Sequence, residues 1–174
     1  MRKIAIIIGS ISDLSQCDNG LRYLSNSDIR RNVEVVGIYI RSQHRNTPSL
    51  QQVLTELSQM KIDAIIAGAG WANHLTGCSD AYLRYTLRDD KIVVLGVAFE
   101  DKDNMVHTQA AILSMTEVPG TQVVYENEDG PFVGREGFFQ ACRMAAILEL
   151  PKIKLPGPKP GEDLSLEEAL KKSL

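Results

Sequence analysis

Short, continuous hydrophobic runs recur along the chain and predict buried β-strands. Four of them, rich in Ile, Val and Ala, cover residues 3–8, 33–40, 62–67 and 92–97. Such runs, without alternation of polar and apolar positions, are typical of strands buried on both faces, as in a parallel sheet. A fifth strand is predicted at residues 121–125, after the turn-forming pair Pro119-Gly120.

Between these runs the spacing of apolar residues changes to that of helices. After Pro48, which suits a first helical turn, four apolar side chains recur at a helical period: Leu50, Val53, Leu54 and Leu57. Further helices are predicted at residues 75–87, 108–115 and 134–148. Alternating strands and helices place helices on both faces of a parallel sheet. The predicted fold class is therefore α/β, a three-layer sandwich around a central parallel sheet of about five strands.

The last part of the chain, residues 151–174, differs in composition from the α/β domain at residues 1–150. Prolines at four positions stop regular structure there: Pro151, Pro156, Pro158 and Pro160. The tetrapeptide Ser165-Leu166-Glu167-Glu168 then matches a capping box and predicts a short terminal helix. Two interpretations are open for this helix, which either packs on its own subunit or serves as an arm that reaches a neighbouring subunit.

Composition and charge narrow the functional class. The 174 residues are 44% hydrophobic and 24% charged, which suits one globular domain, and the net charge of -3 provides no general field for nucleic acid or anionic membrane. No uninterrupted apolar run exceeds five residues, whereas a membrane span needs about 20. The N-terminus lacks the pattern of a secretory signal, and the three cysteines form no CxxC pair. We expect a cytoplasmic enzyme or binding domain.

Small, hydroxylic and ionisable residues follow each of the first four predicted strands. In open parallel sheets, ligands bind beyond the carboxyl ends of the strands, so these segments predict a pocket at one edge of the sheet. In the first segment, Gly9 allows close backbone approach, and Ser10 and Ser12 could bind phosphate. The alternative is that Ser12 or Asp13 merely caps the following helix.

The second segment adds the charged groups that such a pocket needs. Arg45 is a bidentate anion donor near Ser42, and the adjacent His44 can transfer protons at neutral pH. Solvated loop residues are the alternative interpretation for Arg45 and His44. Both interpretations of His44 are left open by the residues alone.

The third segment begins with Gly68-Ala69-Gly70, but Asn73 stands where a dinucleotide-binding GxGxxG would need its third glycine. Its glycines suit a flat ligand lying against the backbone. Trp71 could stack on a ligand or on a neighbouring subunit, or be buried against its own loops. His74 is either a second titrating group or a hydrogen-bonding residue at a helix start. The acidic segment with Glu100, Asp101 and Asp103 is interpreted as a solvated loop rather than a metal site.

Taken together and in order, these segments resemble the PurE family of purine biosynthesis. The family pattern G-S-x-S-D stands here as residues 9–13, S-A-H-R-T-P corresponds to residues 42–48, and G-A-G-G-A-A-H-L-P-G corresponds to residues 68–77. The likeness continues through residues 94–97, 113–115 and 118–120 and covers about residues 3–148. It implies a flavodoxin-like fold and a homo-oligomer, typically an octamer, that acts on a small ribonucleotide without nucleic acid or membrane.

The resemblance also implies the roles of individual residues. His44 would be the proton shuttle that interconverts N5-carboxyaminoimidazole ribonucleotide and 4-carboxy-5-aminoimidazole ribonucleotide through released carbon dioxide, with no metal, ATP or other cofactor. Ser10, Ser42 and Arg45 would hold the 5′-phosphate, beside Gly9, and Asp13 the ribose hydroxyls. The base would be surrounded by a group of residues from the third segment: Gly70, Ala72, His74 and Leu75. His74 favours the mutase branch, because the branch that uses free carbon dioxide usually lacks it.

The sequence also departs from the family pattern. Gln43 and Trp71 replace the usual alanine and glycine, Asn73 and Thr76 replace alanine and proline, and Asn46 is an additional residue. The family's Q-S-K segment after the fourth strand has no counterpart here. A non-catalytic ribonucleotide-binding or scaffold paralogue is the alternative function, although such a protein would need neither His44 nor Asp13.

Overall fold

The uninterrupted apolar runs form the parallel sheet that their composition predicts. In a computed structural model, which describes residues 1–173, four strands lie in the order β2-β1-β3-β4. They are β1 (Arg2–Ile8), β2 (Val33–Ile40), β3 (Ala64–Ala69) and β4 (Val93–Ala98). All pairings are parallel. This is the beginning of the flavodoxin-like strand order, in which the chain moves to opposite sides from β1 and β3.

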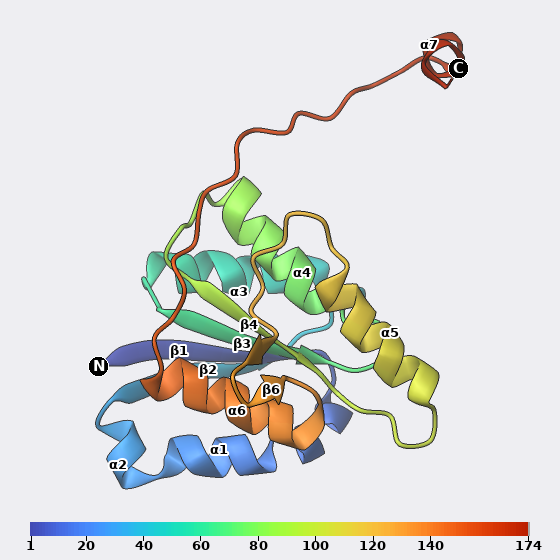
Figure 1. Cartoon of the computed structure of the whole chain (residues 1–174). Coiled ribbons are helices and arrows are strands. Elements are labelled where there is room, and N and C mark those ends of the chain that lie inside the picture. Colours follow the sequence, from blue (N-terminus) through green and yellow to red (C-terminus); the bar gives the residue numbers. More distant parts are fainter. Residues whose placement is uncertain (174) are drawn as a thin grey trace.

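Helices cover both faces of the sheet and complete a three-layer α/β sandwich (Figure 1). On one face lie α1 (Asp18–Ser25) and α6 (Gly134–Ile147), with the short α2 (Ser27–Arg30) beside α1. On the other lie α3 (Thr47–Gln59) and α4 (His74–Ala81), which continues into the π-helical turn η2 (Tyr82–Thr86). Next to α4 and β4 is α5 (Met105–Thr116), and a 3₁₀ helix, η1 (Ile11–Gln16), precedes α1.

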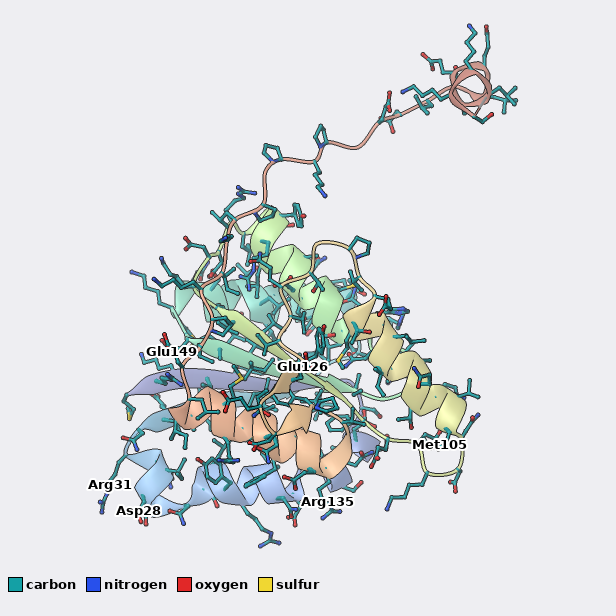
Figure 2. The ribbon with its side chains drawn as sticks, in the orientation of Figure 1. Asp28, Arg31, Met105, Glu126, Arg135 and Glu149 are labelled. Atoms are coloured by element: carbon teal, nitrogen blue, oxygen red, sulfur yellow. The ribbon has the colours of Figure 1, made fainter. Side chains whose placement is uncertain are left out.

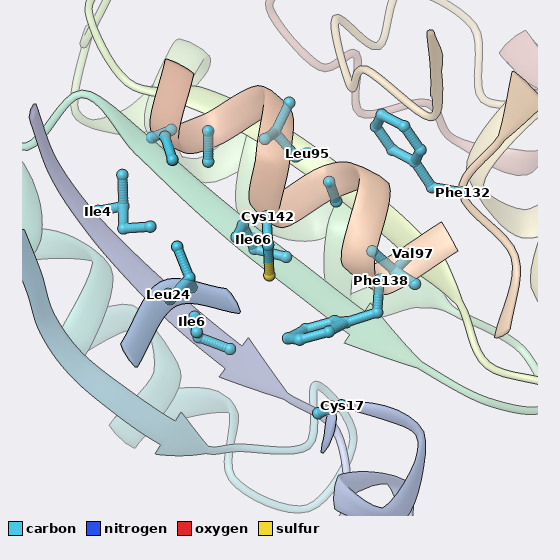
Figure 3. Packing of buried hydrophobic residues seen from close by; sticks show 14 of the residues in the cluster. Ile4, Ile6, Cys17, Leu24, Ile66, Leu95, Val97, Phe132, Phe138 and Cys142 are labelled. Carbon is cyan, nitrogen blue, oxygen red and sulfur yellow. The ribbon is translucent and has the colours of Figure 1, made fainter. Parts of the chain in front are cut away.

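Alternate side chains of each strand enter two separate cores. Ile4, Ile6 and Ile8 of β1 pack with α1 and α6, in the layer that Figure 3 shows around Phe138 and Cys142. The intervening residues of β1 pack against the leucines of α3 instead. Both sets are fully buried, which explains why the strands appear in the sequence as continuous apolar runs rather than as alternating ones.

The predicted fifth strand at residues 121–125 is wrong as a continuous strand. Val124 forms a single parallel bridge to Leu95, and Val133 forms another to Ala98. Between them the chain leaves the sheet in a small antiparallel hairpin of β5 (Glu126–Asn127) and β6 (Gly130–Pro131). Gly130 begins β6 directly after the two-residue turn, and its φ of 120° is a conformation that only glycine adopts readily. The edge of the sheet is therefore completed by two bridges from separate segments.

The first residues of the tail contact the domain, and only its terminal helix lies apart. Residues 151–165 contain no helix or strand, and Lys154 and Pro156 accept hydrogen bonds from Gln122 and Arg88. The predicted terminal helix is present as α7 (Leu166–Lys172), with Ser165 and Glu168 forming the capping box. Every residue of α7 is exposed, and Figure 1 shows it well away from the sheet. The interpretation that this helix packs on its own subunit is therefore wrong, while the interpretation as an intersubunit arm stays a prediction.

A buried ion pair fixes the junction of α4 and η2. The side chains of Asp80 and Arg84 are only 3% and 1% exposed, and Arg84 Nε lies 3.0 Å from Asp80 Oδ1. The guanidinium also donates to the carbonyls of Asp89 and Ile92, at 2.8 and 2.5 Å. The second carboxylate oxygen of Asp80 accepts from the backbone N–H of Gln122 at 2.9 Å. The pair thus ties the α4–η2 helix to β4 and to the segment that completes the sheet edge.

We predict that Arg84→Met lowers the free energy of unfolding by about 3–5 kcal/mol, because it leaves the Asp80 carboxylate buried without a counter-charge. Urea denaturation measures the change. The control is Arg31→Met, since Arg31 pairs with Asp28 on the exposed surface of α2 (Figure 2), and such a change should stay within about 0.5 kcal/mol. Adding Asp80→Asn to Arg84→Met should recover part of the loss. Equal effects of Arg84→Met and Arg31→Met would contradict the prediction.

Candidate functional site

A hollow of about 500 Å³ lies where β1 and β3, adjacent in the sheet, end together. This is the point from which the chain leaves in opposite directions, and such points bind ligands in open α/β sheets. Its lining comes from the last residue of β3 and from the segments that follow the first three strands: Gly9, Ser10, Ser12, Asp13, Ser42, Gln43, His44, Arg45, Ala69, Gly70, Trp71, Ala72 and Leu75. Among the residues expected from the sequence, all line this hollow except His74, which contacts a lining residue.

The first segment is held tightly against the end of β3. The backbone N–H of Gly9 donates to the carbonyl of Gly68 at 2.9 Å, and a Cβ on Gly9 would lie only 2.9 Å from that of Ala69. Ser12 Oγ donates to Ser10 Oγ at 2.9 Å. Neither Ser12 nor Asp13 caps a helix, because both lie inside η1. The capping interpretation of this segment is therefore wrong, and its polar side chains face the hollow.

Asp13 is a partly buried carboxyl group that lines the site. Burial raises its pKa above the ordinary value of 3.8, while hydrogen bonds from the backbone of Gly70 and Ser10 and the charge of Arg45 act in the opposite direction. Burial is the largest of these effects, so the folded chain disfavours the carboxylate. A ligand hydroxyl that donates to this group would replace water that burial has removed.

The second segment is closed by its own hydrogen bonds. The backbone N–H of the buried Ser42 donates to Asn46 Oδ1 at 3.2 Å, and the N–H of Arg45 donates to Ser42 Oγ at 3.3 Å. The Arg45 guanidinium reaches the first segment and donates to the carbonyl of Gly9 at 3.4 Å. The additional Asn46 therefore stabilises the turn, and the exposed guanidinium lies beside the hydroxyls of Ser10 and Ser42 at the same hollow.

His44 and His74 meet across the hollow's rim. His44 Nε2 lies 2.9 Å from His74 Nδ1, and the two rings stand edge to face with centroids 5.1 Å apart. A hydrogen bond between two imidazoles needs one ring as donor and the other as acceptor. The contact thus fixes the orientation of His44 through His74, the first residue of α4, although 30 residues separate the two in the sequence.

The third segment is anchored by Asn73, which is fully buried. Its amide donates to the carbonyl of Val97 in β4 at 2.8 Å, and its Oδ1 accepts from the N–H of Thr76, capping α4. These bonds place His74 and the buried Leu75 at the start of the helix. The replacement of alanine by Asn73 therefore adds an anchor to the segment and puts no new group into the hollow.

Trp71 adopts an unusual backbone conformation beside this anchor. Its φ is +58°, in the left-handed region that costs a side-chain-bearing residue about 1–2 kcal/mol. The indole stacks on the ring of His107 with centroids 3.8 Å apart and an angle of 20° between the planes. The residue is nevertheless 64% exposed, so the interpretation that it is buried against its own loops is wrong.

The acidic segment after β4 is engaged in local contacts. Asp101 Oδ2 lies 2.7 Å from His107 Nδ1, and Asp101 Oδ1 accepts from the backbone N–H groups of Asp103 and Asn104. The hydrogen bond with His107 is the main cause of the lowered pKa of Asp101. No group of three potential metal ligands occurs among residues 1–173. In the same part of the chain, no helix has the length and apolar character of a membrane span.

The family model described as AIR carboxylase matches residues 3–129 of this sequence. The chain belongs to the AIR carboxylase family. It is 30% identical over 157 residues to the N5-carboxyaminoimidazole ribonucleotide mutase of Pyrococcus abyssi, a match that covers 90% of this chain and 77% of the relative. Among solved structures it is similar to Treponema denticola PurE, with 21% identity, a TM-score of 0.48 and coverage of 71% and 70% of the two chains.

Membership of the AIR carboxylase family confirms the PurE resemblance drawn from the three motifs. The chain is accordingly an enzyme of the PurE type, which functions in purine biosynthesis. The matched range contains all three segments that line the hollow and ends before α6 and the tail. Sequence reasoning left out Gln43 and Ala69 as lining residues, and for Trp71 it offered stacking on a ligand as only one of several interpretations. Proximity to the expected residues was the one signal available for Gln43 and Ala69.

We predict that Asp13→Asn raises the free energy of unfolding at pH 7. Because the folded-state pKa is raised, the wild type loses stability as pH rises from below 3.8 through that raised value, whereas asparagine carries no charge to bury. Chemical denaturation between pH 4 and pH 7 should give a stability advantage that shrinks as pH falls. Asp28→Asn, which changes an exposed carboxylate, is the control. A variant less stable than the wild type at pH 7 would contradict this.

Proposed function

We propose that this enzyme is an N5-carboxyaminoimidazole ribonucleotide mutase, which interconverts that compound and 4-carboxy-5-aminoimidazole ribonucleotide by releasing and recapturing carbon dioxide. The observation that carries the proposal is the convergence of three strand-end segments on one hollow, with His44 hydrogen-bonded to His74 at its rim. The name of the Pyrococcus abyssi relative supports the reaction. The pairing of His74 with His44 favours the mutase over direct carboxylation by free carbon dioxide.

The reaction needs a group that both gives and takes one proton. When the carbamate C–N bond breaks, carbon dioxide leaves and the amine nitrogen must gain a proton. The neighbouring ring carbon then forms a bond to carbon dioxide and must lose its own proton to restore aromaticity. A single imidazole can donate the first proton and accept the second, so the protein is unchanged at the end. We assign this shuttle to His44, with His74 as its positioning partner.

The remaining residues of the hollow suit the ribose phosphate. The guanidinium of Arg45 and the hydroxyls of Ser10 and Ser42 offer charged and neutral donors to a phosphate from two adjoining segments. Asp13 offers carboxylate oxygens to the ribose hydroxyls. The backbone at Gly70 and Ala72, followed by the side chain of Leu75, leaves a flat wall for the base. The purified protein incubated with the N5-carboxy ribonucleotide, without ATP, should produce the absorbance of the 4-carboxy isomer at a rate independent of added bicarbonate.

We predict that His44→Asn retains ligand affinity but lowers turnover at least about a hundredfold, because a positioned base contributes about 10²–10⁴-fold and asparagine cannot exchange the proton. Absorbance assays give the rate, and calorimetric titration of the carboxylated product gives the affinity. His74→Asn should lower the rate less, since it removes only the partner of His44. A wild-type rate in His44→Asn would remove His44 from the mechanism.

We predict that Arg45→Ala weakens binding of the ribonucleotide by about 1.5–3 kcal/mol, the usual value of a charged hydrogen bond. The same variant should bind the corresponding nucleoside, which lacks the phosphate, as the wild type does. Arg41→Ala is the matched control, because Arg41 lies three residues before His44 but donates to Ser49 and does not line the hollow. Equal ribonucleotide affinity of Arg45→Ala and Arg41→Ala in calorimetry would overturn the phosphate assignment.

A further inference from the structure

Trp71 stands between two hollows. It lines the candidate site, and it also lines a neighbouring hollow of about 450 Å³ whose walls include Gln16, Lys102 and Arg135. Asp13 and Gly70 are shared by both hollows. Trp71 therefore forms part of the boundary between the candidate site, where the base is expected, and the neighbouring hollow.

One face of the indole is occupied and the other is free. His107 stacks on it nearly parallel, at a centroid distance of 3.8 Å, and His107 is itself held by Asp101 at 2.7 Å and Asn104 at 3.2 Å. Because Trp71 is still 64% exposed, the ring face opposite His107 is accessible. An exposed aromatic ring that is held rigidly by a network behind it loses little freedom when a planar ligand stacks on it.

The backbone conformation of Trp71 also indicates a ligand-binding position. A bulky residue in the left-handed region persists only where its surroundings hold it, and such outliers gather at ligand-binding positions. Trp71 has a φ of +58° and lies between Gly70 and Ala72. All three residues line the candidate site. The stack on His107 holds the ring, and Asn73, two residues further on, anchors the same segment to Val97.

We propose that Trp71 is a specificity-determining residue whose free indole face stacks on the heterocyclic ring of the bound ribonucleotide, with His107 as the positioning residue behind it. This inference rests on the proposed function, because it takes the ligand to be an aminoimidazole ribonucleotide. Base–aromatic stacking is favourable for any planar ring and selects ligands with an aromatic base over those without one. Trp71 thus adds discrimination at the base, while Arg45 acts on the phosphate.

The chain provides its own reporter, because Trp71 is its single tryptophan. In the free protein, acrylamide should quench the fluorescence efficiently. Aminoimidazole ribonucleotide should change the emission and protect it from acrylamide, whereas ribose 5-phosphate should bind in calorimetry with little effect on either. A tryptophan already shielded from acrylamide in the free protein would mean that a second copy covers it, and would overturn the proposal. Unchanged emission under calorimetric saturation with the ribonucleotide would overturn it as well.

Variants separate stacking from folding. Trp71→Gly should weaken binding of the ribonucleotide by about tenfold, and Trp71→Phe by much less. His107→Ala should weaken binding by an intermediate factor, whereas His107→Phe keeps a ring behind the indole and should bind nearly as the wild type does. Ribose 5-phosphate affinity should be unchanged throughout. An equal loss of affinity for the ribonucleotide and for ribose 5-phosphate in Trp71→Gly would indicate a structural role and refute the proposal. Absence of mutase turnover in a wild type that passes the fluorescence test would refute only the proposed reaction.

Discussion

The close approach of β1 and β3 at their carboxyl ends is the constraint on which the rest of the structure depends. The Gly9 N–H donates to the Gly68 carbonyl, and neither residue has room for a side chain: a Cβ would lie 2.9 Å from Ala69 at the first and 2.6 Å from Phe99 at the second. Because β1 and β3 pair directly, β2 and β4 lie on the outer sides, and the segments that follow β1 and β3 diverge. The hollow between them is a consequence of the strand order.

Around this hollow, two residues that differ from the family pattern, Asn46 and Asn73, support the segments that agree with it. Asn46 closes the turn on Ser42, and Asn73 joins the third segment to β4 and begins α4. Both act through backbone groups, which leaves Arg45 and His44 free to face a ligand. Departures in a motif can therefore leave its chemistry intact when the new side chains satisfy buried backbone groups instead of entering the site.

Periodicity and residue type were sufficient to predict the four strands, the helices on both faces and the edge at which the polar segments gather, because burial on two faces imposes continuous apolar runs. The segment at residues 121–125 is also rich in residues that favour strands but lies at the edge, where Val124 alone pairs and the hairpin of β5 and β6 diverts the chain. A local pattern cannot distinguish an edge bridge from a strand. Nor could it identify the exposed position of α7, since amphipathic spacing says nothing about what a helix packs on.

The contact between Trp71 and His107 was beyond sequence reasoning for a different reason. It joins residues 36 positions apart through a backbone conformation that is rare for tryptophan, and neither local propensity nor family motif predicts it. His107 in turn depends on Asp101, whose other oxygen organises the turn before α5. The stack and these hydrogen bonds offset the free-energy cost of the left-handed conformation, which glycine would avoid. Tryptophan at position 71 therefore depends on His107 and its hydrogen-bond partners, and this network leaves one face of the indole exposed.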